Sequence, residues 1–143
     1  MIDPNQIPPV SDDELLARFI TQVKQYRPND QSVKPDLFIP FRRTELSVTR
    51  HREATTEELW RVGHDVAALR QQTLHGRSDV RASDCAIESL SVVPKPILSP
   101  VERYNPNHAN IAGFPFSKED QKALAIKIAH KASKRILNTL SYK

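Results

Sequence analysis

The chain has 143 residues, of which 38% are apolar and 6% aromatic, and its 21 basic and 17 acidic side chains give a formal net charge of +4. This length suits one domain with a single core, and no apolar run approaches the roughly 18 residues of a membrane-spanning helix. A single cysteine, Cys85, excludes an internal disulfide and a cysteine-based zinc site, and the N-terminus lacks the basic and apolar regions of a secretory signal, so we expect a cytoplasmic protein.

Residues 1–10 contain three prolines, which predicts an irregular lead-in before the first regular element. Ser11 and Glu14 then have the spacing of a helix capping box. The apolar residues of the segment 15–23 recur at helical spacing. We therefore expect a first helix that ends before Pro28, because the residue preceding a proline avoids the helical region.

Three later segments have the features of short strands. Residues 45–50 and residues 88–93 alternate between apolar and polar side chains and are rich in β-branched residues. Residues 107–113 predict a third strand that ends at a glycine. Residues 37–41 form a short apolar run with Pro35 before it and Pro40 within it. We therefore expect at most an edge strand or a docked extended segment there.

The remaining elements are predicted to be helical. A second capping box, Thr55 with Glu58, begins a helix that we expect to reach about Gln72, with Trp60 on its buried face. Residues 75–79 predict a turn and residues 80–85 one or two helical turns. The last helix is expected over residues 117–136, with an apolar stripe on one side and lysines on the other.

The order of these elements predicts an α+β fold, with a small sheet of about three short strands covered by three main helices. Residues 11–143 would form this single domain, without internal repeats. A strand–helix–strand crossover between residues 45 and 93 is possible and would make that pair of strands parallel. Residues 94–106 contain four prolines and predict a long loop.

The positive charge is concentrated at the C-terminal end. Residues 118–143 contain seven basic and two acidic residues, whereas the rest of the chain contains 14 basic and 15 acidic ones. The last helix presents Lys127, Lys131 and Lys134 on one face. Our leading hypothesis is an accessory or interaction domain that binds an acidic protein face or nucleic acid there. The alternative interpretation is an ordinary solvated helix face.

Two histidines at predicted strand ends indicate a second function. His51 follows one strand and His108 begins another, so adjoining strand ends would place both imidazoles at one site. Imidazole titrates near neutral pH, and two such groups can act as general acid and general base. The alternative is that both rings hydrogen-bond to loop backbone. Shared catalysis requires the two rings to lie within about 10 Å of each other.

Arginines near these histidines would hold a phosphate group through paired hydrogen bonds, with asparagines orienting it. This arrangement would serve a metal-independent enzyme that processes nucleotides or RNA. The candidate ligand-binding residues are Arg50, Arg77, Asp79, Asn107 and Asn110.

No other cofactor or metal site is indicated. The five histidines show no HxH or HxxxH spacing, so we predict no metal site. The three glycines lie too far apart to form a phosphate-binding loop, so we expect no nucleotide cofactor. Cys85 is expected to be a small buried residue rather than a nucleophile. A homo-oligomeric structural protein remains a further possibility, and the sequence leaves the oligomeric state open.

Four segments taken together, SDDELLARF, ELSVTRH, GRSD and NPNHANIAG, resemble a group of small single-domain bacterial proteins of unassigned function. This resemblance covers most of the chain and implies a bacterial cytoplasmic setting. It transfers no fold, activity or ligand. Within those segments it points to seven polar residues, namely Arg50, His51, Arg77, Asp79, Asn107, His108 and Asn110.

Overall fold

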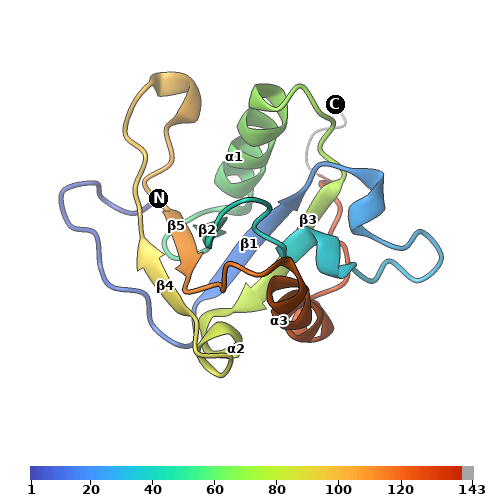
Figure 1. Ribbon diagram of the computed structural model, residues 1–143. Coiled ribbons are helices and arrows are strands. Elements are labelled where there is room, and N and C mark those ends of the chain that lie inside the picture. The colour runs from blue at the N-terminus through green and yellow to red at the C-terminus, as the bar shows by residue number, and fades with distance from the viewer. Residues whose placement is uncertain (140–143) are drawn as a thin grey trace.

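A five-stranded antiparallel sheet forms the centre of the protein (Figure 1). The computed structural model describes residues 1–139. The strands lie in the order β3-β1-β2-β5-β4. Their bounds are β1 Leu15–Ile20, β2 Glu45–Arg50, β3 Gly76–Arg81, β4 Ser91–Pro94 and β5 His108–Ala112.

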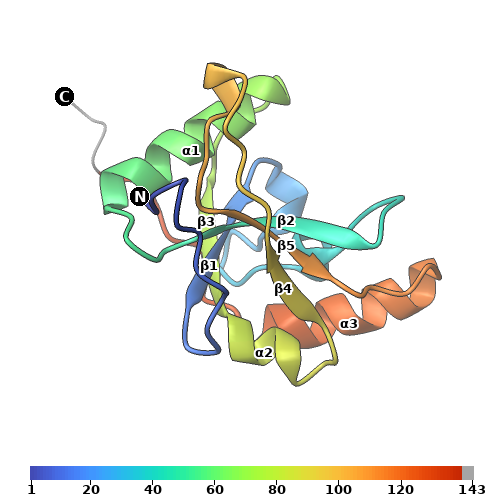
Figure 2. The same ribbon diagram turned by 90° about the vertical axis from the view of Figure 1, so that its left-hand side faces the viewer.

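Helices cover both faces of this sheet (Figure 2). Their bounds are α1 Thr56–Leu69, α2 Ala82–Ala86 and α3 Lys118–Lys131. On one face, Val62 of α1 joins Ala17 and Phe19 of β1 in a small apolar cluster. On the other face, Ala125 and Ile128 of α3 belong to the main core. The fold is therefore α+β, as the sequence predicts, but its sheet has five strands instead of about three.

Strand β1 lies where the sequence predicts the first helix, so that prediction is wrong. β1 pairs with β2 on one side and β3 on the other, and both faces of the sheet are covered. A strand buried on both faces has apolar residues at consecutive positions, and such a run also fits helical spacing. Ser11 and Glu14 close a turn before the strand, where the Ser11 backbone amide donates to Glu14 Oε2 over 2.8 Å.

Strand β3 replaces the predicted turn at residues 75–79. It pairs with β1 over six residues, and a C-terminal segment runs along its other edge. Gly76 has a φ of 138°, and a Cβ atom added there would lie 2.6 Å from the carbonyl oxygen of Ile136. Gly76 therefore allows Arg77 to exchange backbone hydrogen bonds of 3.0 and 2.8 Å with Ile136. α2 follows at once and overlaps the predicted helical turns of residues 80–85, although residues 80 and 81 belong to β3.

The other three strands confirm the predicted ones, with shifts of a few residues at their ends. β2 and β4 run in the same direction, as the possible crossover implies, but they are not neighbours, because β5 lies between them and is antiparallel to both. Residues 37–41 are not a strand. Leu37 and Phe38 instead belong to a buried 3-10 helix, Pro35–Phe38, which packs against α3.

Helix α1 confirms its predicted capping box. The Glu58 backbone amide donates to Thr55 Oγ1 over 3.1 Å, and the Thr55 amide donates to Glu58 Oε1 over 2.9 Å. Trp60 is buried, as predicted. α3 starts after its predicted cap but ends at Lys131 rather than residue 136, because the following segment crosses to β3. There the Ser133 amide donates to the carbonyl of Asp79 over 2.8 Å.

Two irregular segments lie against the sheet and its helices. Residues 1–10 contain no helix or strand, yet Ile2 is buried and its amide donates to Asn107 Oδ1 over 2.9 Å. Residues 95–107 form a projecting loop beside α1 that contains the short 3-10 helix Val101–Arg103 (Figure 1). Within residues 1–139, no helix has the length and apolar character needed to cross a membrane.

Candidate functional site

A gap between β1 and β2 is filled by the side chain of Arg18. β1 pairs with β2 only at Leu16 and Ala17, although it pairs with β3 along its whole length. Beyond Ala17 the Arg18 guanidinium takes the place of strand pairing. Its Nε donates to the carbonyl of Leu37 over 2.9 Å and its Nη1 to the carbonyl of Ser47 over 3.0 Å. β1 and β2 are therefore separated beyond Ala17, and the Arg18 guanidinium lies between them.

Two cavities meet at Arg18, and Ser47 and Arg70 also line both of them. The first has a volume of about 220 Å³ and lies between β1, α1 and the loop 95–107. The second has a volume of about 370 Å³ and has a more polar lining. We refer to the two together as the Arg18 cleft. Volumes of this order suit a small ligand.

The first cavity is mainly apolar. Its walls include the apolar side chains of Phe19, Val62, Val66, Leu69 and Ile97. Polar groups stand at its edges, on β5 and on the loop 95–107. They belong to Tyr104, Asn105 and His108. An apolar wall with a few polar groups is the usual composition of a site for an organic ligand.

Positive charge exceeds negative charge in the Arg18 cleft, where the two linings contain five basic residues (Arg18, Lys24, Arg43, Arg70 and Arg103) and three acidic ones (Asp36, Glu45 and Asp65). Within residues 1–139, Arg18, Arg43 and Arg70 form no ion pair with a carboxylate. Of the acidic residues, Asp65 pairs with Arg61 over 3.6 Å, and in the described part of the chain Asp36 and Glu45 form no ion pair with these arginines. Uncompensated arginines at one cavity are characteristic of sites that bind anions.

The pKa values of two of these arginines reflect the same situation. Burial and the nearby charge of Arg70 lower the pKa of Arg18 to about 9. Partial desolvation and the charge of Arg43 lower the pKa of Arg70, whose side chain is otherwise exposed. In both cases the charged form is destabilised, and an anion placed between the guanidinium groups would stabilise it. The site is therefore electrostatically prepared for a negative ligand.

His108 contributes a hydrogen-bond acceptor to this cleft. Its Nδ1 lies 2.8 Å from the carbonyl oxygen of Lys95, and since a carbonyl only accepts, Nδ1 carries the proton. Burial, together with the charge of Arg18, lowers the pKa of His108, so the ring is neutral at pH 7. Its Nε2 then has a free lone pair that can accept a hydrogen bond from a ligand or take a proton.

His51 has different surroundings. Its Nε2 lies 2.9 Å from Asp79 Oδ1, and Arg77 Nε lies 3.2 Å from the same oxygen. The Arg77 guanidinium also stacks on Trp60, 4.8 Å from the ring centroid. The structure thus brings together three of the predicted site residues, His51, Arg77 and Asp79. They form a network between β3 and the residue that follows β2, whereas His108 belongs to β5 and lines the Arg18 cleft.

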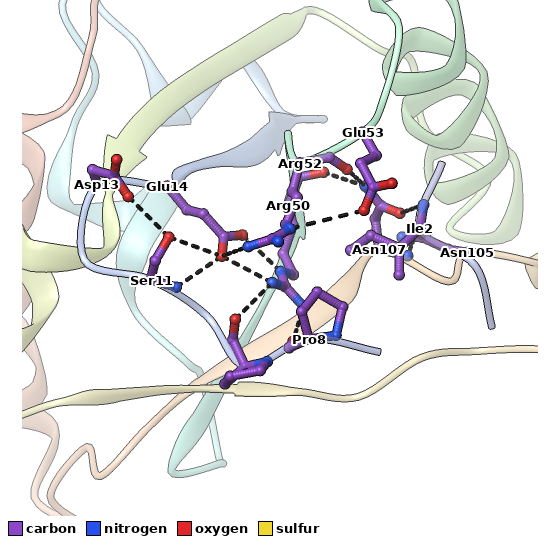
Figure 3. Close-up of polar contacts among 11 residues, drawn as sticks. Ile2, Pro8, Ser11, Asp13, Glu14, Arg50, Arg52, Glu53, Asn105 and Asn107 are labelled. Carbon is purple, nitrogen blue, oxygen red and sulfur yellow. Dashed lines mark hydrogen bonds and ion pairs between the residues drawn. The ribbon is translucent and has the colours of Figure 1, made fainter. Parts of the chain in front are cut away.

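Arg50 and Asn107 occupy a buried network that anchors the N-terminal segment (Figure 3). Arg50 is fully buried, and its Nε and Nη2 donate to the Glu14 carboxylate over 2.7 and 2.8 Å. Its remaining contacts are to the carbonyls of Pro8 and Pro9. Asn107 Nδ2 donates to the backbone carbonyl of Arg50 over 2.7 Å. These contacts give both residues a role in holding the fold together.

The other predicted residues lie away from the Arg18 cleft or at its border. Asn110 is in the middle of β5, opposite Ser47. Lys127 Nζ lies 3.4 Å from Glu88 Oε1 and Lys131 Nζ 3.9 Å from Asp84 Oδ1, so this lysine face is partly neutralised by the same chain. Lys134 is exposed beyond the end of α3.

Sequence reasoning missed all four arginines of the cleft, namely Arg18, Arg43, Arg70 and Arg103. Arg18 is the one charged residue of β1, LLARFI, and a helical interpretation of that segment assigns it to a solvent-facing side. Arg43 and Arg70 come from two further segments that only the fold brings near it. The detectable signal was a lone charge within an apolar run, which in a buried strand requires a partner or a function.

The described part of the chain gives little support for metal binding or thiol chemistry. No three His, Cys, Asp or Glu side chains among residues 1–139 are grouped as a metal site requires. Cys85 is buried, and burial raises the pKa of its thiol to about 12, which keeps it protonated at neutral pH.

Comparisons with protein-family models, curated proteins and solved structures found no match to this chain. Its function must therefore be argued from the Arg18 cleft itself.

Proposed function

We propose that this protein binds a nucleotide-like ligand in the Arg18 cleft, with a phosphate group on the arginines and an apolar or aromatic body in the first cavity. The observation that carries the proposal is the uncompensated pair Arg18 and Arg70 at the junction of the two cavities. Guanidinium groups bind phosphate oxygens through charge-assisted hydrogen bonds. The adjoining apolar walls would exclude water around the ligand body.

His108 would orient the ligand. Its unprotonated Nε2 can accept a hydrogen bond from a hydroxyl or amino group of the bound molecule. Acid–base catalysis by two histidines would need a second ring at the same phosphate. His51 instead binds Asp79 of β3. We therefore propose ligand binding as the principal function and keep phosphate-ester chemistry at His108 as the alternative.

The proposal is tested by isothermal titration with adenosine monophosphate, adenosine and inorganic phosphate. We expect the monophosphate to bind tightest, because it occupies both cavities. Arg18→Gln and Arg70→Gln should each weaken its binding about tenfold or more, since a charge-assisted hydrogen bond contributes roughly 1.5–3 kcal/mol. Arg70 is the cleaner variant, because its exposed side chain makes no hydrogen bond that the fold needs.

The matched control is Lys127→Gln combined with Lys131→Gln, which removes positive charge outside the cleft. These substitutions should leave the affinity for the monophosphate unchanged. Equal binding of adenosine and its monophosphate, or normal binding by both arginine variants, would refute the proposal. If only the lysine variant lost affinity for the monophosphate, the basic face of α3 would be the binding surface and the proposal would fail.

A further inference from the structure

A third cavity adjoins the Arg18 cleft. It has a volume of about 470 Å³ and lies between the turn that precedes β2 and the start of α3. Arg43 lines both this cavity and the second cavity of the cleft, so the two hollows are neighbours. Figure 2 shows this turn and the loop before α3 at the same end of the molecule.

A buried glutamine holds this region in place. Gln121 of α3 donates from its Nε2 to the carbonyl of Arg43 over 2.8 Å and to that of Pro115 over 2.7 Å. Gln121 is 4% exposed, so these hydrogen bonds are shielded from water. The two loops are therefore joined in a defined arrangement.

Aromatic rings stand exposed beside this cavity. Phe116 is 93% exposed and lines the third cavity, while Phe41 is 47% exposed and lines the second. Lys24 Nζ lies 5.6 Å from the centroid of the Phe41 ring. A solvent-exposed aromatic ring is available to contact a partner, and it stacks most readily on a partner that contains planar rings.

The same surface is strongly basic. The linings of the three cavities include only three acidic residues, Asp36, Glu45 and Asp65. The basic residues in the same linings are Arg18, Lys24, Arg42, Arg43, Arg70, Arg103 and Lys118. Glu119 and Asp120 lie next to Lys118 in the first turn of α3 and reduce the field there. The excess remains positive, and it follows the line of the cavities.

We propose that single-stranded nucleic acid binds along this line, with bases stacked on Phe41 and Phe116 and with phosphates held by Arg42, Arg43 and Lys118. We call these five residues the Phe116 surface. A terminal nucleotide of the strand occupies the Arg18 cleft, so this inference rests on the proposed function and extends it from a nucleotide to an oligonucleotide. Alternating rings and cations suit a strand whose bases are unpaired, whereas an acidic peptide would leave the rings unused.

Fluorescence anisotropy with a labelled oligothymidylate of about ten nucleotides tests the proposal, since sites on single strands span roughly 4–16 nucleotides. We expect the oligonucleotide to bind at least tenfold tighter than thymidine monophosphate. Phe116→Ala should weaken oligonucleotide binding about fivefold or more and leave the monophosphate affinity unchanged. Because Phe116 is almost fully exposed, this variant should fold normally. Lys127→Gln is the matched control and should bind like the wild type.

Four results decide the question. If the monophosphate binds but the oligonucleotide binds no tighter, the extension is wrong while the proposed function stands. If Phe116→Ala and the double variant Arg42→Gln, Lys118→Gln both bind the oligonucleotide normally, the Phe116 surface is not the binding surface. If poly-glutamate displaces the oligonucleotide at equal concentration of charges, the surface prefers an acidic polypeptide and the proposal fails. If neither nucleic acid probe binds, both proposals fail.

Discussion

At the scale of single residues, Arg50 and Arg18 have opposite surroundings. Those of Arg50 suit a structural role, and those of Arg18 suit ligand binding. Arg50 is fully buried and satisfied by the Glu14 carboxylate and by backbone carbonyls. Arg18 also reaches two carbonyls, but no carboxylate balances its charge and the neighbouring Arg70 repels it. A protein retains such an arrangement at a cost in stability when a ligand supplies the missing negative charge.

The Glu14–Arg50 pair predicts a specific dependence of stability on pH. Burial alone would raise the pKa of Glu14, but hydrogen bonds from Arg50 and Ser11 and the charges of Arg50 and Arg52 outweigh burial, so its pKa lies below its usual range. The unfolded chain therefore binds this proton more readily than the folded one. The stabilisation from Glu14 is complete above the unfolded-state pKa and is lost as pH falls through the folded-state pKa.

Urea unfolding of the wild type and Glu14→Gln between pH 3 and 7 measures this contribution. The variant leaves the buried Arg50 charge without its partner, so we expect a loss of about 3–5 kcal/mol at pH 7. The difference between the two proteins should shrink as the solution becomes acidic. A difference that stays constant across this range would show that Glu14 does not contribute through its charge.

At the scale of elements, the sequence predicts those helices and strands that have one buried face and one exposed face. α1 has one buried face and a capping box, and the alternating strands β2 and β5 were found within a residue or two. β1 was missed because it is covered on both faces, where a strand loses its alternation. β3 was missed because Gly76 indicates a turn, and because its two partners, β1 and the segment at Ile136, each lie about sixty residues away along the chain.

The candidate site was predictable only in part, for the same reason. The sequence singles out His108 as a strand-end polar residue, and in the structure this residue lines the Arg18 cleft. The arginines beside it come from β1, the turn before β2 and the end of α1. Their convergence depends on the separation of β1 from β2, which no local pattern in the sequence describes.

The packing of α1 on β1 provides a test of the sheet-and-helix arrangement beside the cleft. Gly63 of α1 faces Phe19, and a Cβ atom added at Gly63 would lie 2.8 Å from two atoms of that ring. Gly63→Ala should therefore destabilise the protein by about 1–3 kcal/mol through overpacking, despite alanine's higher helix propensity. Thermal unfolding measures the effect. A stabilised variant would mean that α1 does not approach β1 this closely.

At the scale of the whole molecule, the distribution of charge in the folded protein differs from its distribution along the sequence. The sequence places the positive excess in residues 118–143, yet two of the lysines there lie beside acidic residues of the same chain, Asp84 and Glu88. Folding gathers a second basic region from segments whose net charge is unremarkable. This region surrounds the three cavities and includes exposed aromatic rings, which the lysine face of α3 lacks.

The most direct measurement is an amide chemical-shift map of the protein titrated with adenosine monophosphate. Our account predicts that the largest changes occur at the residues of the Arg18 cleft, with Ser47, Arg70 and His108 among them, and that α3 around Lys127 and Lys131 stays unchanged. Changes concentrated on the lysines of α3, with none in the cleft, would contradict the central claim.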